Sequence, residues 1–330
     1  MFTQEQLSAL VQQGIETIDY PTLAPTLYDP VRYTLQSGGK RLRPMLVLMA
    51  ANLFTEDLSA AITPAIGLEM YHNFTLLHDD VMDKAPDRRG RPTVHVKWDD
   101  NTAILSGDAM QALAYRLIAT APHYCLKEVI DLFTDTNIEI DEGQQMDMEF
   151  ETRDDVTVDE YLEMIRLKTS VLLGCALKMG ALIGKATPEQ AQTLYEFGQN
   201  IGIAFQLQDD WLDCWGDPKT FGKRIGGDIL CNKKTFLRIK AEQKMPLPII
   251  EAGIQASEML PEAELKIAQD QKIETFKAYY ISTGAEQACR DAIAHYHKLG
   301  LDALAKLKGI QDEKLALLKS FAAKLENRNV

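Results

Sequence analysis

Long apolar segments constrain the fold of this chain more than any other feature. Residues 61–83 and 171–184 carry apolar side chains on nearly every face of a helical projection. A helix without a polar face has to be covered by other elements, so both segments belong inside a larger helical assembly. No segment sustains the period-two alternation and β-branched content that are typical of strands, so we expect no sheet. The pattern predicts an all-α fold.

The helical pattern continues along most of the chain. Further helices are predicted at about 126–150, 157–184, 188–215, 261–282, 284–302 and 311–327. The segment "PDRRGRPTVHVKWDD" (residues 86–100) contains two prolines and a glycine and is predicted to be a loop. Residues 216–232 and 242–260 have the least regular pattern and are predicted to be loops or broken helices.

Length and composition limit the possible classes of protein. The 330 residues can bury a large core, and no Gly/Ser-rich linker divides them, which predicts one domain over residues 1–330. The net charge of −13 argues against a nucleic-acid partner, because nucleic acids bind to clustered positive charge. The five cysteines form no C-x-x-C pair, which is typical of reduced thiols in the cytoplasm. No signal peptide and no membrane-spanning run is apparent, so we expect a cytoplasmic protein without membrane insertion.

The first chemical signal is a group of aspartates at the end of an apolar segment. In "LLHDDVMD" (residues 76–83), Asp79 and Asp83 are four residues apart, which places them on one helix face and roughly 6 Å apart along the axis. Two carboxylates at this spacing repel each other, so helix stability does not explain them. Carboxylate ligands of Mg²⁺ would, since Mg²⁺ usually binds one or two carboxylates and completes its shell with water and phosphate oxygens. A solvated acidic helix end is the alternative.

The same spacing occurs a second time. In "FQLQDDWLD" (residues 205–213), Asp209, Asp210 and Asp213 again follow an apolar helical run. Chance rarely produces two D-D-x-x-D motifs at the ends of two apolar helices. The repeat therefore favours two carboxylate clusters that bind metal.

Short basic clusters accompany the aspartates, each beside a glycine or a predicted helix end. They are Lys40, Arg41 and Arg43; Arg88, Arg89 and Arg91; Arg166 and Lys168; Lys223 and Arg224; and Lys233 and Lys234. Each alone is typical of a surface loop. A diphosphate explains the whole set, because metal ions bridge its oxygens to carboxylates while Arg and Lys neutralise the remaining charge.

The motifs resemble those of the trans-prenyltransferases, the polyprenyl synthetase family, of the short-chain farnesyl and geranylgeranyl diphosphate synthase type. The resemblance lies in "GGKRLRP", "LLHDDVMDKAPDRRGRPTVH", "KTS", "AFQLQDDWLD" and "FGKRIGGDILCNKKT", in this order between residues 38 and 235. It implies a single helical bundle of the isoprenoid synthase type I fold around a central cavity. It also implies a homodimer and a Mg²⁺-dependent condensation of isopentenyl diphosphate with an allylic diphosphate, with three Mg²⁺ per active site. An allylic cation forms on ionisation and must be protected from water.

The resemblance also implies roles for individual residues. Asp79 and Asp83 would bind Mg²⁺ with Asp80 in support, and Asp209 would bind a further Mg²⁺ while Asp210 and Asp213 act largely through water. Isopentenyl diphosphate would be bound by Lys40, Arg43, His72 and Arg89. The allylic diphosphate would be bound by Arg88, Lys168, Lys223 and Lys233, with Thr169 and Gln206 directing oxygens toward the cation.

Product length depends, by the same resemblance, on bulk below the first aspartate motif. Phe74 and Tyr71 lie five and eight residues before Asp79, roughly 7 and 12 Å deeper along a helix. An aromatic residue at position 74 implies a C15 or C20 product, and Thr75 leaves room that slightly favours geranylgeranyl over farnesyl diphosphate. Simple core packing is the alternative role for both aromatic residues.

Two other functions are compatible with a helical chain that carries an aspartate motif. A class I terpene cyclase would usually replace the second D-D-x-x-D motif with an Asn/Ser/Glu motif. A non-catalytic subunit that regulates a partner synthase would commonly lose one of the two motifs. Both motifs are intact here, which favours the catalytic synthase.

Overall fold

The computed structural model describes residues 2–217, 225–246 and 262–326. In this part of the chain almost all regular structure is helical, and the all-α fold is confirmed. The helices of the N-terminal part are α1 (Gln4–Glu16), α2 (Pro25–Leu35), α3 (Leu42–Phe54), α4 (Ser59–Met82), α5 (Val94–Lys97), α6 (Asp100–Ile118) and α7 (Leu126–Phe150). Those that follow are α8 (Val158–Ile165), α9 (Val171–Ile183), α10 (Pro188–Trp215), α12 (Gly227–Leu230), α13 (Phe236–Glu242), α15 (Glu262–Thr283), α16 (Ala285–Ala305) and α17 (Asp312–Glu326).

The chain forms two compact units. Unit 1 comprises residues 1–135, 173–195 and 307–318, and unit 2 comprises residues 136–172, 196–306 and 319–330. Helices α7, α9, α10 and α17 each contribute residues to both units. The prediction of one domain over the whole chain stays a prediction.

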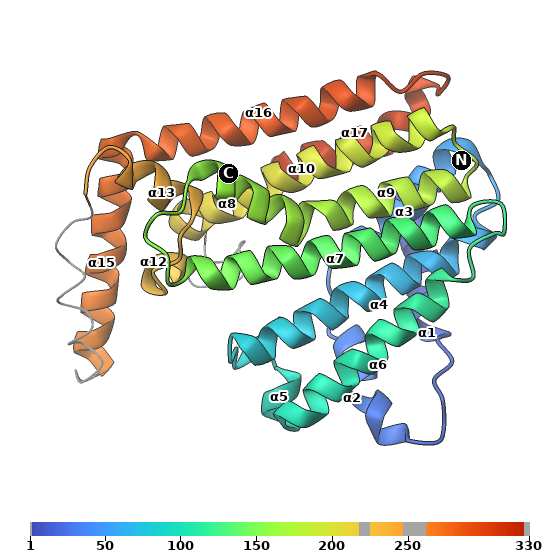
Figure 1. The fold of residues 1–330 in the computed structure, drawn as a ribbon, viewed down its shortest axis with the longest axis horizontal. Coiled ribbons are helices and arrows are strands. Elements are labelled where there is room, and N and C mark those ends of the chain that lie inside the picture. The colour runs from blue at the N-terminus through green and yellow to red at the C-terminus, as the bar shows by residue number, and fades with distance from the viewer. Residues whose placement is uncertain (1, 218–224, 247–261, 327–330) are drawn as a thin grey trace. The chain divides into compact units, whose positions relative to one another are not determined.

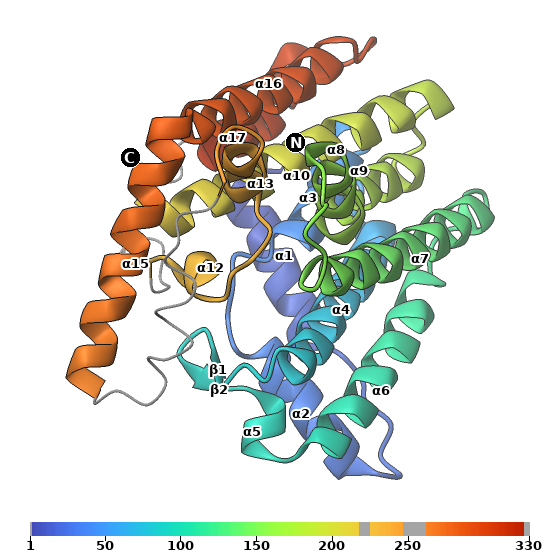
Figure 2. The ribbon, with the colours of Figure 1, turned by 60° about the vertical axis from the view of Figure 1, so that its left-hand side comes forward.

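The expectation of no sheet was wrong at one place. Strands β1 (Asp87–Arg88) and β2 (Arg91–Pro92) form an antiparallel pair after the end of α4 (Figure 2). The two residues between them, Arg89 (φ +55°) and Gly90 (φ +71°), both adopt left-handed backbone conformations. This is the geometry of the two-residue hairpin turn that suits the natural twist of paired strands. Helix α5 also lies in this segment, which was predicted to be a loop throughout.

In unit 1, helix α4 packs along α6 and also against α3 and α1 (Figure 1). The approach to α6 is close because glycines stand at the contact. A Cβ added to Gly67 of α4 would lie 2.7 Å from Ile118 Cγ1, and one added to Gly107 of α6 would lie 2.2 Å from His78 Nε2. Helix α4 has thirteen buried residues, as its apolar sequence predicted. Burial of these side chains fixes the position of the motif at its C-terminal end.

In unit 2, a core of apolar side chains joins α8, α13, α15 and α16 to the C-terminal part of α10. Its members include Tyr161, Leu207, Phe236, Phe276 and Cys289. Between α8 and α9 the helix widens into one π-helical turn, Arg166–Ser170. Gly143 of α7 and Gly202 of α10 allow backbone to approach this turn, since an added Cβ would lie 2.4 Å from Lys168 N or 2.7 Å from Ser170 Cα. Such turns insert one residue and redirect the side chains around them.

No helix in the described part of the chain is long and apolar enough to cross a membrane.

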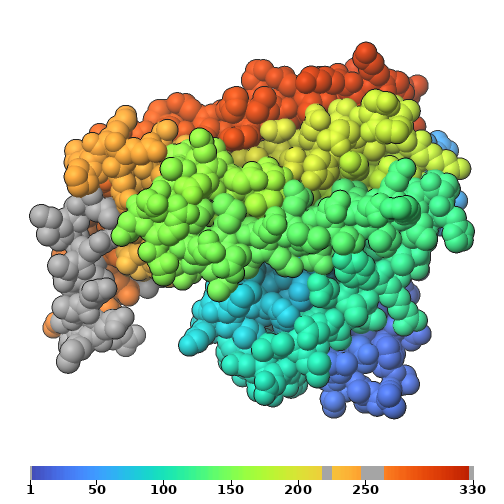
Figure 3. All heavy atoms as spheres, viewed as in Figure 1, coloured from blue at the N-terminus to red at the C-terminus, as the bar shows by residue number. Residues whose placement is uncertain are grey.

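Side chains of α7 lie open at the surface along much of the helix (Figure 3), and they include the exposed apolar residues Ile138 and Met148. Scattered exposed apolar residues of this kind are normal for protein surfaces.

Candidate active site

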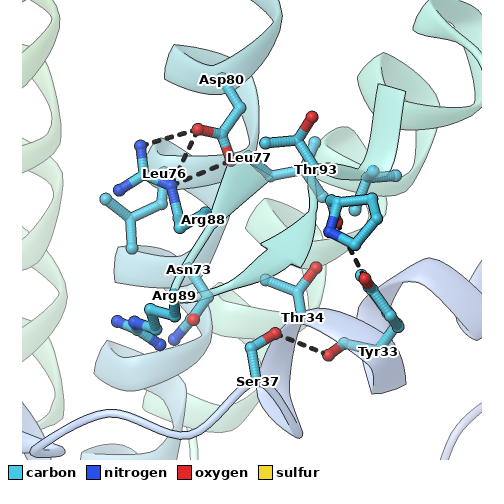
Figure 4. A pocket seen from close by; sticks show the side chains of 12 residues that line it. Tyr33, Thr34, Ser37, Asn73, Leu76, Leu77, Asp80, Arg88, Arg89 and Thr93 are labelled. Atoms are coloured by element: carbon cyan, nitrogen blue, oxygen red, sulfur yellow. Dashed lines mark hydrogen bonds and ion pairs between the residues drawn. The ribbon is translucent and has the colours of Figure 1, made fainter. Parts of the chain in front are cut away.

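The first aspartate motif lies at the C-terminal end of α4, in unit 1. Asp79 is partly exposed and Asp83, at the C-cap, is exposed, whereas Asp80 is 5% exposed. Asp80 turns toward the β1–β2 hairpin, where Arg88 Nε donates to Asp80 Oδ1 at 2.8 Å and Oδ2 at 3.0 Å (Figure 4). Arg88 Nη2 lies 2.7 Å from Asp80 Oδ1. The three aspartates therefore differ: two reach solvent, and the third holds an arginine.

The carboxylates of the first motif fit a hard divalent cation. Asp79 and Asp83 lie one helical turn apart and offer oxygen ligands at the accessible end of a helix. Among the described residues, no group of three or more His, Cys, Asp or Glu side chains converges to hold a metal ion. The carboxylate pair suits Mg²⁺, which usually binds one or two carboxylates and completes its shell with water and phosphate oxygens.

A cluster of cations in unit 1 consists of Lys40, Arg41 and Arg43 of the segment 38–43 together with Arg89, which contacts that segment. Arg43 Nη1 lies 3.1 Å from His72 Nε2, Arg41 Nη1 lies 2.7 Å from Glu69 Oε1, and Arg89 Nη1 donates to the carbonyl oxygen of Gly38. Burial lowers the pKa of His72 well below its usual value, and Arg43 and the neighbouring arginines lower it further. His72 is therefore a neutral imidazole beside the guanidinium of Arg43. The structure brings together Arg43, His72 and Arg89, three of the four residues predicted to bind isopentenyl diphosphate, while Lys40 is exposed in the same segment.

A small pocket opens beside this cluster. It is lined by residues of α2 and the turn after it, of α4 and of the segment 88–94, among them Ser37, Asn73, Asp80, Arg88 and Arg89 (Figure 4). Tyr33 closes one side, and its hydroxyl donates to the carbonyl oxygen of Pro92 at 2.8 Å. The pocket places an arginine pair and a carboxylate around one small space.

The second aspartate motif lies near the C-terminal end of α10, in unit 2. Asp209 is partly exposed, whereas Asp210 and Asp213 are 4% and 7% exposed. The hydroxyl of Tyr161 donates to Asp210 Oδ2, and Asp228 N donates to Asp213 Oδ2 at 3.0 Å. Burial raises the pKa of Asp210 to about 8, and the charge of Asp228 raises it in the same direction. In this motif one aspartate is accessible to a ligand and two contact the protein, whereas in the first motif two are accessible and one is paired.

The π-helical turn of unit 2 carries the predicted "KTS" residues. Lys168 Nζ lies 2.6 Å from Asp147 Oδ2 of α7. Thr169 Oγ1 donates to Gln206 Oε1 of α10 at 3.5 Å, so the two residues predicted to face the allylic cation lie side by side. Lys233 is exposed just before α13. Lys223 lies outside the described residues.

The two aromatic residues predicted to limit product length contact each other in unit 1. Tyr71 is fully buried, and its ring centroid lies 5.5 Å from Phe74 and 5.0 Å from Phe133 of α7. Phe74 is 8% exposed, and its ring lies 4.7 Å from that of His78. Along α4, Phe74 is thus the nearer of the two to Asp79, and its ring contacts that of Tyr71.

Sequence reasoning missed three residues that contact the predicted site residues. Asp147 pairs with Lys168, Tyr161 bonds to Asp210, and Glu69 pairs with Arg41. Only Glu69 gave a local signal, because it is a carboxylate within an apolar helix that lacks a polar face. The contacts of the other two depend on elements that are remote in sequence.

Known proteins resemble this chain in sequence and in fold. The family model for polyprenyl synthetase matches residues 24–267. A curated geranylgeranyl diphosphate synthase of Methanosarcina mazei is 42% identical over 239 residues, which are 72% of this chain and 74% of that protein. A crystal structure of a geranylgeranyl pyrophosphate synthase is 43% identical, with a TM-score of 0.90 and coverage of 100% of both chains.

A solved structure with ligands is also similar. The geranylgeranyl pyrophosphate synthase of Corynebacterium glutamicum, in complex with isoprenyl diphosphate and magnesium, is 26% identical with a TM-score of 0.80. The match covers 99% of this chain and 98% of that one. The match over more than half of the chain, together with the two motifs and their basic partners, shows that this chain belongs to the polyprenyl synthetase family of prenyltransferases.

Proposed function

We propose that this prenyltransferase condenses isopentenyl diphosphate with allylic diphosphates, head to tail, and releases all-trans geranylgeranyl diphosphate. The observation that carries the proposal is the presence of both aspartate motifs, each with an accessible aspartate and each near a basic side chain of its own unit, Arg88 for the first and Lys233 for the second. The geranylgeranyl diphosphate synthase of Methanosarcina mazei, at 42% identity, supports this product.

The carboxylates Asp79, Asp83 and Asp209 would hold Mg²⁺ on the allylic diphosphate. When bound, Mg²⁺ neutralises the charge that develops on the diphosphate as the C–O bond breaks. In this proposal Asp80, Asp210 and Asp213 act through the groups that they contact. Arg88 is oriented by Asp80, and Asp213 fixes the backbone of residue 228. Three Mg²⁺ per active site remains part of the proposal.

The basic residues divide between two diphosphates. Lys40, Arg43, His72 and Arg89 would bind isopentenyl diphosphate, and the neutral imidazole of His72 adds a hydrogen bond without adding charge. Arg88, Lys168, Lys223 and Lys233 would bind the allylic diphosphate as it leaves. Fixed cations of this kind stabilise a leaving group most where water is excluded. A homodimer is the assembly that we propose.

Thr169 and Gln206 would stabilise the allylic cation. Their side-chain oxygens lie together on facing helices of unit 2, and such oxygens can face a carbocation without reacting with it. The double bond of isopentenyl diphosphate then attacks the cation, and the proton that is lost passes to the departing diphosphate.

The proposal is tested by incubating the purified chain with Mg²⁺, isopentenyl diphosphate and each of the C5, C10 and C15 allylic diphosphates. Products are sized by mass spectrometry. We expect a C20 diphosphate from all three starters. A C15 end product would contradict the product assignment, a cyclic hydrocarbon would indicate a terpene cyclase, and no turnover would indicate a regulatory subunit.

A further inference from the structure

The basic segment 38–43 adopts an unusual backbone. Gly38 (φ +77°), Gly39 (φ +122°) and Arg41 (φ +46°) all lie in the left-handed region. Glycine enters this region without cost, but a residue with a Cβ is rare there and persists only where its surroundings hold it. Arg41 therefore needs an anchor outside the segment.

The anchor of Arg41 is a carboxylate buried in α4. Arg41 Nη1 lies 2.7 Å from Glu69 Oε1, and Arg41 Nη2 donates to the carbonyl oxygen of Leu35. Glu69 is 2% exposed, and Asn73 Nδ2 donates to the same Oε1 at 2.9 Å. A buried carboxylate persists only with partners, so the two donors fix its position and through it the guanidinium.

Glu69 also acts on the other cations of the cluster. Burial lowers the pKa of Arg43 to about 10, whereas the charge of Glu69 opposes that change. The same carboxylate favours the charged form of Arg89, whose pKa is lowered mainly by burial and by Arg41. The negative charge of Glu69 thus offsets part of the repulsion among the three arginines.

Arg43 keeps hydrogen-bonding capacity at this point. Its Nε is buried and has no hydrogen-bond acceptor in the described part of the chain, although Nη1 contacts His72. A buried donor without an acceptor is costly, and natural proteins tolerate it where a ligand supplies the acceptor. Arg43 is thus held ready for an anionic ligand, and the contacts of Arg41 hold the backbone two residues before it.

The geometry points to Glu69 as a positioning residue for the isopentenyl diphosphate site. It fixes Arg41 in its left-handed conformation, and the fixed turn presents Lys40 on one side and Arg43 on the other to the diphosphate. Glu69 itself does not touch the substrate. The inference rests on the proposed function, because it assumes that Lys40 and Arg43 bind isopentenyl diphosphate.

The test compares Michaelis constants in Glu69→Gln, Arg41→Lys and the double variant. Glu69→Gln keeps the size and an acceptor oxygen but removes the charge, and Arg41→Lys keeps the charge but cannot reach both acceptors. We expect the KM for isopentenyl diphosphate to rise between about tenfold and 100-fold in each, the range typical of a lost charged hydrogen bond. The KM for the allylic diphosphate should change less than about twofold. The double variant should be no worse than the more impaired single variant, as residues acting through one contact are not additive.

Asn52→Ala is the matched control. Asn52 is a buried polar residue of unit 1 that bonds to Phe2, so its loss lowers stability without touching the basic segment. We expect its two KM values to stay unchanged. An equal rise of both KM values in Glu69→Gln, a strictly additive double variant, or no rise at all would overturn the inference. If Glu69→Gln does not fold, the split between the two KM values in Arg41→Lys decides in the same way.

Lys40→Ala and Arg43→Ala separate this inference from the proposed function. If neither raises the KM for isopentenyl diphosphate, the binding site itself is wrongly assigned and both proposals fail. If both raise it while Glu69→Gln and Arg41→Lys do not, the binding site stands and only the positioning role fails.

Discussion

Arg88 and Asp80 form an ion pair in which the guanidinium nitrogen Nη2 lies 2.7 Å from Asp80 Oδ1, while Arg88 Nε contacts both carboxylate oxygens. The pair joins the first aspartate motif to strand β1 of the hairpin that follows it. Asp80 therefore differs in environment from Asp79 and Asp83, which reach solvent. The motif therefore contains two kinds of aspartate.

The first prediction concerns this difference. Asp79→Asn should lower kcat by about 100-fold or more, because it removes charge stabilisation of the leaving group. Asp80→Asn and Arg88→Gln should each raise the KM for the allylic diphosphate, with a coupling energy of about 1–3 kcal/mol in a double-mutant cycle. Steady-state kinetics of the four proteins in the cycle measure this. Independent effects of Asp80→Asn and Arg88→Gln would show that the ion pair has no role in substrate binding.

The second prediction concerns Asp147, which lies 2.6 Å from Lys168 Nζ on the π-helical turn. Asp147→Asn should lower kcat/KM for the allylic diphosphate by about tenfold, since a charge-assisted hydrogen bond that orients Lys168 is lost. Glu139→Gln is the control, because Glu139 lies on the same helix and pairs with Arg166 at 3.2 Å. Equal kinetics for the two variants would argue against a role for Asp147.

The third prediction concerns product length. Phe74→Ala should extend the product beyond C20, because it removes an aromatic ring that lies five residues before Asp79 on α4. Tyr71 is fully buried against Phe133, so Tyr71→Ala should cost about 3–5 kcal/mol of stability, and Tyr71→Phe is the better partner variant. Products are sized by mass spectrometry. An unchanged C20 product in Phe74→Ala and in the double variant with Tyr71→Phe would leave both rings as core residues only.

The fourth prediction concerns pH. The folded state lowers the pKa of His72 below its usual value of 6.5, so the unfolded chain binds the proton first as the pH falls. This residue therefore reduces the free energy of unfolding below about pH 6.5, and the reduction grows until the pKa of the folded state is reached. His72→Gln removes this effect. Denaturant melts at pH 7 and pH 5.5 should show a smaller loss of stability in His72→Gln than in the parent chain, and equal losses would contradict the neutral, buried imidazole.

The helices illustrate how far local pattern reaches. The predicted helix over residues 126–150 has the observed bounds of α7, Leu126–Phe150, and the prediction for 188–215 matches α10. Both segments have clear periodicity between identifiable ends. The β1–β2 hairpin escaped prediction because two residues per strand cannot show period-two alternation, and its signal was the turn at Arg89 and Gly90. The π-helical turn within 157–184 likewise has no local signature. Its close neighbours are Gly143 and Gly202, which come from other helices and approach the turn from remote parts of the sequence.

The sequence by itself determined the fold class, the two aspartate motifs and the basic residues near them, because apolar periodicity and residue spacing are local properties. Only the tertiary structure decided which of those residues are accessible and which are held by a partner. Asp80 and Asp210 look like their neighbours in sequence, but one faces Arg88 and the other faces Tyr161, 49 positions away. Glu69 and Arg41 are 28 positions apart and meet because α4 packs beside α3. Burial and pairing of charges arise from contacts between remote segments, and no local pattern records them.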